Sequence, residues 1–450
     1  MTIESQSTSA AAESGVVRLR GPVLSFSSRP ADERSAGVDH LADGVVIMRA
    51  GRLDAVVAAD RYRREGGDLD ACEDLRGSLI IPGLIDLHIH CPQMDVIASY
   101  GSQLLEWLER YAYPAELAFA DPAHARAQSE RFLDRLAAHG TTSALVLGSV
   151  HAAATDALFE AAARRNVRLA AGKVLMNRHG PVALRDRTDG IDETVALIER
   201  WHGRGRLAYA VTPRFALACS PDQLRRAGEL LVHYPGVYLH THLAEHPEEL
   251  AATRRTFPEA SDYVGVYERF GMVGPRSVFA HGIHLTDSEL QRLGAAGSTV
   301  AFCPSSNLFL GSGLLDLSRL DRFGVGLGVA TDVGAGTSFS MLATLGDGYR
   351  VAQLTGRSWH PLEALYTATL GNARALGWED SVGRLVPGHE ADVVVLAPRP
   401  GSVLADRLRT ASTLTDTVFA YLILGADAVS RTYVAGELVH PREAAVDAGP

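Results

Sequence analysis

The middle of the chain alternates short apolar runs with longer segments in which apolar residues recur at helical spacing. The apolar runs predict eight strands, at 84–89, 143–147, 169–175, 207–211, 237–241, 277–280, 299–302 and 326–330. The segments between them predict amphipathic helices, for example at 123–139, 155–164, 193–203 and 222–233. Strands that alternate with helices form a parallel sheet, and eight such strands close a barrel. The pattern therefore predicts an α/β protein with a (β/α)8 TIM-type barrel over residues 79–383.

An open doubly wound sheet is the structural alternative, because it is built from the same alternation of strands and helices. Sheets of that kind commonly carry a glycine-rich phosphate-binding turn after a strand. No predicted strand here is followed by GxGxxG, and no GxxxxGK[ST] occurs in the chain. The barrel is therefore favoured.

The two ends of the chain consist mainly of short β-rich runs joined by tight turns. A hairpin is predicted to turn at Ala50-Gly51 near the N-terminus, and a second one at Ala435-Gly436 near the C-terminus. We expect the ends, residues 16–78 and 384–450, to pair into one small β-sandwich domain beside the barrel. Residues 1–15 are rich in Ser and Ala and predict a disordered lead.

Composition and charge narrow the class of protein. The 450 residues are 46% hydrophobic and 21% charged, which is typical of a folded chain, and the net charge of −10 argues against nucleic acid or anionic lipid as a partner. The four cysteines form no CxxC pair, which excludes a disulfide scaffold and suits a reducing compartment. Neither a signal-peptide pattern nor a bilayer-spanning apolar stretch is present, so we expect a cytoplasmic protein with no membrane partner.

Histidine and acidic residues stand where four of the predicted strands end, which is the end of a barrel that carries catalytic groups. His88 and His90 share one face of the first strand, because alternate residues of a strand point the same way. The fifth strand runs into His242, the sixth into His281 and the eighth into Asp332. Since these strand ends meet at one mouth, the sequence predicts a single site.

Imidazole nitrogens together with one carboxylate suit Zn²⁺ or Fe²⁺, whereas Mg²⁺ and Ca²⁺ prefer oxygen ligands. A bound metal makes hydroxide available near neutral pH, and Glu245, three residues beyond His242, is placed to shuttle its proton. Asp332 can both bind the metal and orient the hydroxide, while His281 can polarise or protonate the electrophile. The only lysine, Lys173, falls inside the third predicted strand, so one metal is favoured over a lysine-bridged pair.

Four motifs stand at the predicted strand ends: residues 82–90 (PGLIDLHIH), 241–245 (THLAE), 280–282 (AHG) and 330–332 (ATD). They resemble the signatures of the amidohydrolase superfamily. A further set of segments is 90–93 (HCPQ), 104–116, 172–176 (GKVLM), 212–215 (TPRF), 263–267, 303–308 and 338–342. With these the chain resembles, more narrowly, the guanine deaminases of that superfamily. The split β domain around a barrel is also the superfamily's arrangement.

The resemblance implies residue roles and an activity. It implies zinc ligands at His88, His90, His242 and Asp332, a proton shuttle at Glu245 and an assisting residue at His281, with purine contacts at Gln93, Arg214 and Phe215. It further implies one Zn²⁺ per chain, a homodimer, and hydrolysis of guanine to xanthine and ammonia by a zinc-bound hydroxide. The donor-only Arg214 suits the O6 and N7 acceptors of guanine, and Gln93 offers both a donor and an acceptor.

Three alternatives differ in the function they assign. A related amidohydrolase would deaminate another ring, such as 8-oxoguanine, a triazine or a pterin. A barrel that only binds a ligand would need neither Glu245 nor His281. A nucleic-acid deaminase would carry HxE followed by PCxxC, and no PCxxC occurs in the chain.

Overall fold

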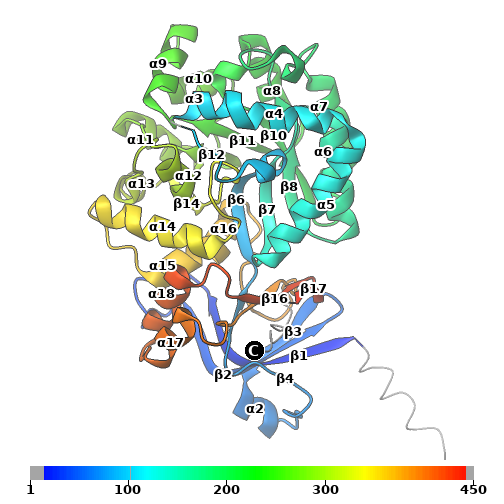
Figure 1. The fold of residues 1–450 in the computed structure, drawn as a ribbon, viewed down its shortest axis with the longest axis vertical. Coiled ribbons are helices and arrows are strands. Elements are labelled where there is room, and N and C mark those ends of the chain that lie inside the picture. The colour runs from blue at the N-terminus through cyan, green and yellow to red at the C-terminus, as the bar shows by residue number, and fades with distance from the viewer. Residues whose placement is uncertain (1–14, 102, 442–450) are drawn as a thin grey trace, which may run out of the picture.

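The computed structural model describes residues 15–101 and 103–441, and it contains the predicted barrel (Figure 1). Except for Gly15, the predicted lead lies outside the described residues. The eight barrel strands run in the order β14-β13-β12-β11-β10-β8-β7-β6, and every pair along this path is parallel. They are β6 (Leu84–His90), β7 (Thr141–Leu147), β8 (Arg168–Gly172), β10 (Leu207–Pro213), β11 (Tyr238–Leu243), β12 (Ser277–His281), β13 (Thr299–Phe302) and β14 (Gly326–Val329), and the short β9 (Val174–Leu175) pairs with β10.

The first and last barrel strands are joined by hydrogen bonds just beyond β14. The Asp332 N–H donates to the His88 carbonyl and the His90 N–H donates to the Val333 carbonyl, both at 2.9 Å. The side-chain amide of Asn372 donates to one carbonyl of β6 and one of β14. The segment that carries Asp332 is therefore held against the strand that carries both histidines.

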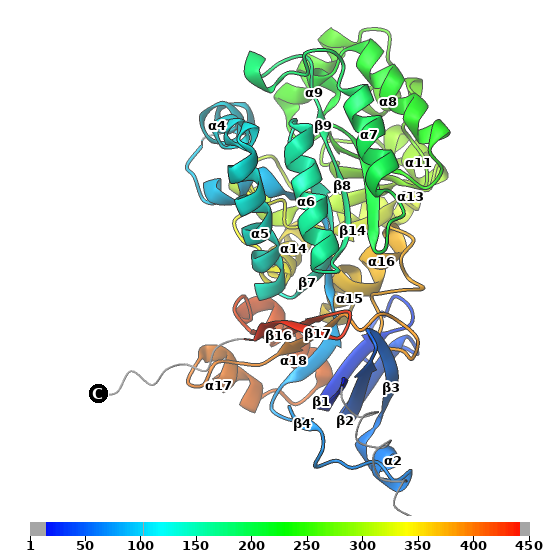
Figure 2. The same ribbon diagram turned by 90° about the vertical axis from the view of Figure 1, so that its right-hand side faces the viewer.

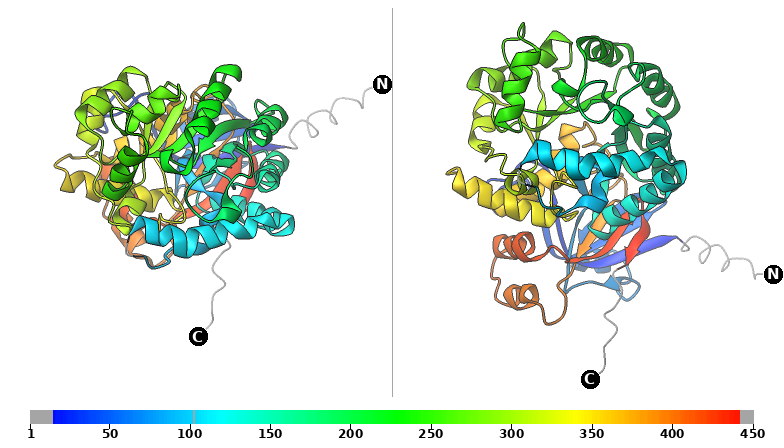
Figure 3. Two further views of the ribbon diagram at one scale, coloured as in Figure 1. Left: turned by 90° about the horizontal axis from the view of Figure 1, so that it is seen from above. Right: turned by 45° about the horizontal axis from the view of Figure 1, so that its top comes forward.

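Helices surround the barrel sheet, as the views from above show (Figure 3). Those predicted from the pattern are present as α5 (Pro122–Ala138), α6 (Ala152–Arg164), α7 (Ile191–Trp201) and α8 (Pro221–His233). The others around the barrel are α3 (Leu104–Trp107), α4 (Tyr113–Leu117), α9 (Pro247–Thr256), α10 (Tyr263–Arg269), α11 (Asp287–Ala295), α12 (Pro304–Phe309), α13 (Leu317–Phe323), α14 (Met341–Leu354), α15 (Pro361–Tyr366) and α16 (Asn372–Ala375). Polar caps begin several of them; Asp121, for example, accepts the Ala123 N–H at the start of α5.

The two chain ends form one small sheet below the barrel (Figure 2). Its order is β17-β16-β15-β5-β1-β2-β3, with β4 beside β1; the strands are β1 (Val16–Phe26), β2 (Val38–Arg49), β3 (Arg52–Ala58), β4 (Glu73–Asp74), β5 (Leu79–Pro82), β15 (Val393–Leu396), β16 (Val429–Val434) and β17 (Glu437–Pro441). Antiparallel pairing of β5 with β15 joins the two ends. Both predicted hairpin turns are present, and Ala50-Gly51 and Ala435-Gly436 all have positive φ, as a two-residue turn between twisted strands requires.

Three helices accompany this sheet: α2 (Ala59–Arg64), α17 (Val403–Arg409) and α18 (Leu414–Leu424). The sequence pattern did not predict α18. Its sequence, LTDTVFAYLIL, is apolar on most sides and therefore shows no amphipathic period. The helix packs against α14 and α15, so the small domain and the barrel share this contact. No helix of the described chain is long and apolar enough to cross a membrane.

Candidate active site

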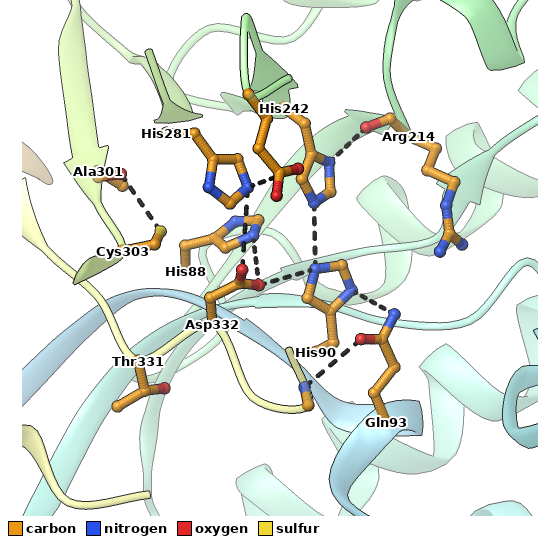
Figure 4. Close-up of polar contacts among 12 residues, drawn as sticks. His88, His90, Gln93, Arg214, His242, His281, Ala301, Cys303, Thr331 and Asp332 are labelled. Carbon is orange, nitrogen blue, oxygen red and sulfur yellow. Dashed lines mark hydrogen bonds and ion pairs between the residues drawn. The ribbon is translucent and has the colours of Figure 1, made fainter. Parts of the chain in front are cut away.

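Four predicted ligands meet at the barrel mouth (Figure 4). His88 and His90 project from β6, His242 from β11, and Asp332 follows β14. One ligand atom from each lies within 4.8 Å of the others, so the group can hold a metal ion. The His90 Nε2 and His242 Nε2 atoms lie 3.1 Å apart, and Asp332 Oδ1 lies 3.1 Å from His88 Nε2.

The chemistry of this group fits a transition metal. His88 Nε2 is buried and makes no hydrogen bond among the described residues. Burial lowers the pKa of His88 and of His242, and that of His90 to about 4, so all three imidazoles are neutral at pH 7 and offer lone pairs. Burial opposes ionisation of Asp332, but the adjacent histidines hold its pKa well below the usual value. Three neutral imidazoles and one carboxylate are a donor set typical of zinc.

Two outer contacts orient these imidazoles. His242 Nδ1 donates to the Arg214 carbonyl over 2.6 Å, which leaves its Nε2 lone pair facing the centre. His88 Nδ1 lies 2.7 Å from Nε2 of His240, which is fully buried on β11. His240 therefore lies behind the ligand group and outside it.

The backbone at the mouth is strained at three residues that have side chains. Ala244, His281 and Asp332 have φ values of +51°, +73° and +51°, in the left-handed region that favours glycine. Such strain persists only where the surrounding structure holds the residue in place, and it is found mostly at functional sites. Here it turns the chain sharply after β11, β12 and β14, so that the strand-end side chains face one another.

Glu245 and His281 complete the polar group. Glu245 is 4% exposed, its Oε1 accepts from the Ser312 hydroxyl over 3.2 Å, and its Oε2 lies 3.4 Å from His281 Nε2. His281 Nδ1 in turn lies 2.9 Å from the side-chain oxygen of Asn307. Burial, together with the Asp332 charge, raises the pKa of Glu245 to about 8. A carboxyl group with that pKa can both take up and release a proton near neutral pH.

Glu249 supports the loop that carries Glu245. It lies in the first turn of α9, and its Oε2 accepts the backbone N–H groups of Glu245 at 3.0 Å and His246 at 3.3 Å. Its other oxygen contacts the Tyr263 hydroxyl. Both carboxylate oxygens are therefore engaged in holding the chain.

A cavity opens onto this group. It is lined by His90, Gln93, Leu104, Trp107, Leu108, Arg214, Phe215, His242, Glu245, Glu249, His281, Asp332 and Ala335. Trp107 and Phe215 bring aromatic surface to it, so a flat ring can stack within the cavity. The three predicted substrate contacts, Gln93, Arg214 and Phe215, thus lie in the same cavity as the metal-ligand group.

A buried carboxylate joins two of those residues. Glu116 accepts from the Gln93 amide over 2.8 Å and from the Arg214 guanidinium over 2.5 Å. Burial opposes ionisation of Glu116, but the Arg214 charge overrides it and lowers the pKa. The pair is therefore ionic.

Lys173 lies away from the metal group. It interrupts the third predicted strand between β8 and β9, is fully buried, and forms an ion pair with Asp186. Glu193 lies 3.4 Å from its Nζ. Its ammonium is thus engaged with carboxylates in the wall of the barrel.

Reasoning from strand ends missed three side chains of the site: Glu116, Glu249 and Ser312. Glu116 lies in α4, Glu249 in α9 and Ser312 in a loop, so none of them follows a strand. A signal was available for Glu249, because His246 and Glu249 have the spacing of a helix capping box, which the structure contains.

Comparisons with known proteins agree with this geometry. Residues 79–439 match the Amidohydrolase family. The chain is 42% identical to guanine deaminase of Escherichia coli over 91% of this chain and 94% of that protein. It is 45% identical to a probable guanine deaminase of Deinococcus radiodurans, over 91% and 94% of the two chains. The solved structure of the E. coli enzyme superposes with a TM-score of 0.90 at 39% identity, covering 95% of this chain and 100% of that one.

Proposed function

Because this chain belongs to the amidohydrolase family, we propose that it catalyses the hydrolytic deamination of guanine to xanthine and ammonia. One observation carries the proposal: the metal-ligand group, Glu245 and the paired Gln93 and Arg214 open onto one cavity. The activity is also that of the bacterial relatives named above, which match nearly the whole chain.

In this proposal, the metal would be held by His88, His90, His242 and Asp332. When bound there, zinc supplies a water molecule that is acidic enough to act as a nucleophile near pH 7. Its ligands are neutral imidazoles apart from Asp332, so the group can carry a dication without excess negative charge.

Glu245 moves the protons of the reaction. Addition of water to C2 of guanine forms a C–O bond, and Glu245 takes one proton from the water and passes it to the adjacent ring nitrogen. A second proton moves from the new hydroxyl group to the amine. The carboxylates of Glu245 and Asp332 both line the cavity and can carry this proton. The C–N bond then breaks and ammonia leaves. His281, 3.4 Å from Glu245, holds the oxygen at the reacting carbon.

Gln93, Arg214 and Phe215 hold the purine. Arg214 donates to acceptors on the edge of the purine ring, and Gln93 pairs with the polar ring atom next to those acceptors. Phe215 provides an apolar wall. Buried polar groups reject ligands that leave them unpaired, by factors much larger than an apolar wall achieves. This arrangement favours a purine over a purely apolar ring.

The finer assignments belong to the same proposal. Zinc at one ion per chain is favoured by the donor set, although Fe²⁺ accepts the same ligands. Four cysteines without a CxxC pair suit a cytoplasmic location, and the resemblance to guanine deaminases implies a homodimer. Metal analysis and the mass of the assembly in solution test these two points.

The first experiment is ammonia release from guanine by the purified protein, with 8-oxoguanine, adenine and cytosine alongside and metal content measured on the same sample. We expect turnover of guanine with one metal ion per chain. Turnover of 8-oxoguanine alone would contradict the substrate while leaving the metal site in place. If no ammonia is released from any of them although metal is bound, the proposed activity is wrong.

A further inference from the structure

We propose that Glu116 is a positioning residue that sets the hydrogen-bonding polarity of Gln93 and Arg214, so that the cavity selects purines with a lactam edge, an N–H beside a C=O. The inference deepens the proposed function and rests on it. Neither the metal group nor the proton shuttle explains why a carboxylate should be buried against both of these side chains.

Glu116 can impose a direction on its partners because it only accepts hydrogen bonds. It is 4% exposed and lies on α4, away from every strand end. Its Oε1 takes the Gln93 amide at 2.8 Å and its Oε2 takes the Arg214 guanidinium at 2.5 Å. An ionised carboxylate has no proton to donate, so each partner must present N–H groups to it.

The orientation of the Gln93 amide follows from this contact. Its Nε2 is turned to Glu116 and lies 3.3 Å from His90 Nδ1, and its Oε1 accepts the Gly334 backbone N–H at 3.4 Å (Figure 4). That contact is long for a hydrogen bond, so the oxygen keeps capacity for a ligand. In the proposal, this oxygen is the acceptor that Gln93, which lines the cavity, offers to a ligand.

The Arg214 guanidinium is held in the complementary orientation. One of its nitrogens binds Glu116, and the Tyr113 ring lies 5.1 Å from its central carbon. Among the described residues, no other side chain or backbone group accepts from the guanidinium, although Arg214 lines the cavity. Its remaining N–H groups are donors available to a ligand.

An acceptor from Gln93 beside donors from Arg214 matches one kind of purine edge. In guanine and hypoxanthine, N1 carries a proton and C6 carries a carbonyl oxygen, so the edge offers a donor beside an acceptor. In adenine and 2,6-diaminopurine the pattern is reversed, with an unprotonated N1 beside an amino group. Arg214 cannot accept and the Gln93 oxygen cannot donate, so an aminopurine would leave both sides unpaired.

The test is Glu116→Gln, which keeps the shape but offers one acceptor and one donor. Its oxygen must face Arg214, so its NH₂ faces Gln93 and turns the Gln93 amide over. Gln93 then presents N–H to the cavity. We expect kcat/KM for guanine to fall about 100-fold, mainly through KM, and the preference for hypoxanthine over adenine in calorimetric binding to fall at least about tenfold.

Two further variants separate positioning from general damage. Gln93→Glu combined with Glu116→Gln moves the carboxylate to the other partner and again presents an acceptor to the cavity, so it should restore the preference for hypoxanthine. Glu363→Gln is the matched control, because Glu363 is also a buried carboxylate bound to an arginine, Arg357, at 2.7 Å, but lies on α15 outside the cavity. It should leave both ligand affinities unchanged.

The outcomes are distinct. Equal weakening of hypoxanthine and adenine in Glu116→Gln, or a loss confined to kcat, would contradict the proposal. If that variant does not fold, the double variant decides, and failure to prefer hypoxanthine there also contradicts it. If the wild-type protein releases no ammonia from guanine yet prefers hypoxanthine through Glu116, the proposed activity is wrong while the role of Glu116 holds.

Discussion

Replacing Glu245 by Gln separates proton transfer from every other contribution of this side chain. Glutamine has nearly the same shape, and its carbonyl oxygen can still accept from Ser312, which now lies 3.2 Å from the carboxylate. Glu245 is not one of the four proposed metal ligands, so the metal should stay. Only the capacity to take up and release a proton is lost.

The structure also predicts the size of the effects. General acid–base groups contribute factors of about 10² to 10⁴, which corresponds to about 3–5 kcal/mol in the activation free energy. Stability should not fall, since burial already raises the pKa of Glu245 to about 8 and Gln resembles the protonated form that the folded chain favours. A large kinetic loss with little structural loss is therefore expected.

The assay is ammonia release from guanine at saturating substrate, with metal content and urea unfolding measured on the same preparations. Glu289→Gln is the matched control, because Glu289 is equally buried at 4% exposure but lies at the start of α11, outside the cavity. Retention of more than about a tenth of the wild-type kcat in Glu245→Gln would refute the proton-shuttle role. Loss of metal together with activity would instead identify Glu245 as a ligand.

Three further predictions test other parts of the structure. Lys173 is the only lysine and is fully buried, so an amine-reactive reagent should leave it unlabelled in the folded chain and label it after unfolding. Labelling of Lys173 in the native protein would contradict its burial. Burial raises the pKa of Glu249 from 4.5 to about 7, so the folded chain keeps a proton that the unfolded chain has released, and the free energy of unfolding should fall as the pH rises through this range. Glu249→Gln should therefore gain about 3 kcal/mol relative to the wild type between pH 5 and pH 8 in urea unfolding, whereas parallel pH profiles would show that Glu249 is ionised throughout. Removal of the metal by a chelator should abolish ammonia release and lower the unfolding midpoint, with recovery on adding Zn²⁺; activity that survives complete metal removal would exclude the proposed chemistry.

Local patterns in the sequence were sufficient to predict the barrel and the candidate ligands. The period of two in a strand places His88 and His90 on one face whatever the rest of the chain does, and the common direction of parallel strands brings His242 and Asp332 to the same end. The period of 3.6 predicted the amphipathic helices but not α18, whose apolar residues surround the helix. Periodicity reports only elements with one buried face.

The contacts between distant residues were decided by the tertiary structure. Glu116 meets Gln93 and Arg214 across separations of 23 and 98 residues, and no local pattern indicates which cation a glutamate will face. Lys173 likewise lies in a predicted strand, but its burial against Asp186 depends on the loop that returns from β9. Backbone periods are properties of neighbouring residues, so the sequence by itself determines which face a side chain occupies. The partner it meets on that face depends on how the closed barrel brings separate segments together, and only the folded chain contains that information.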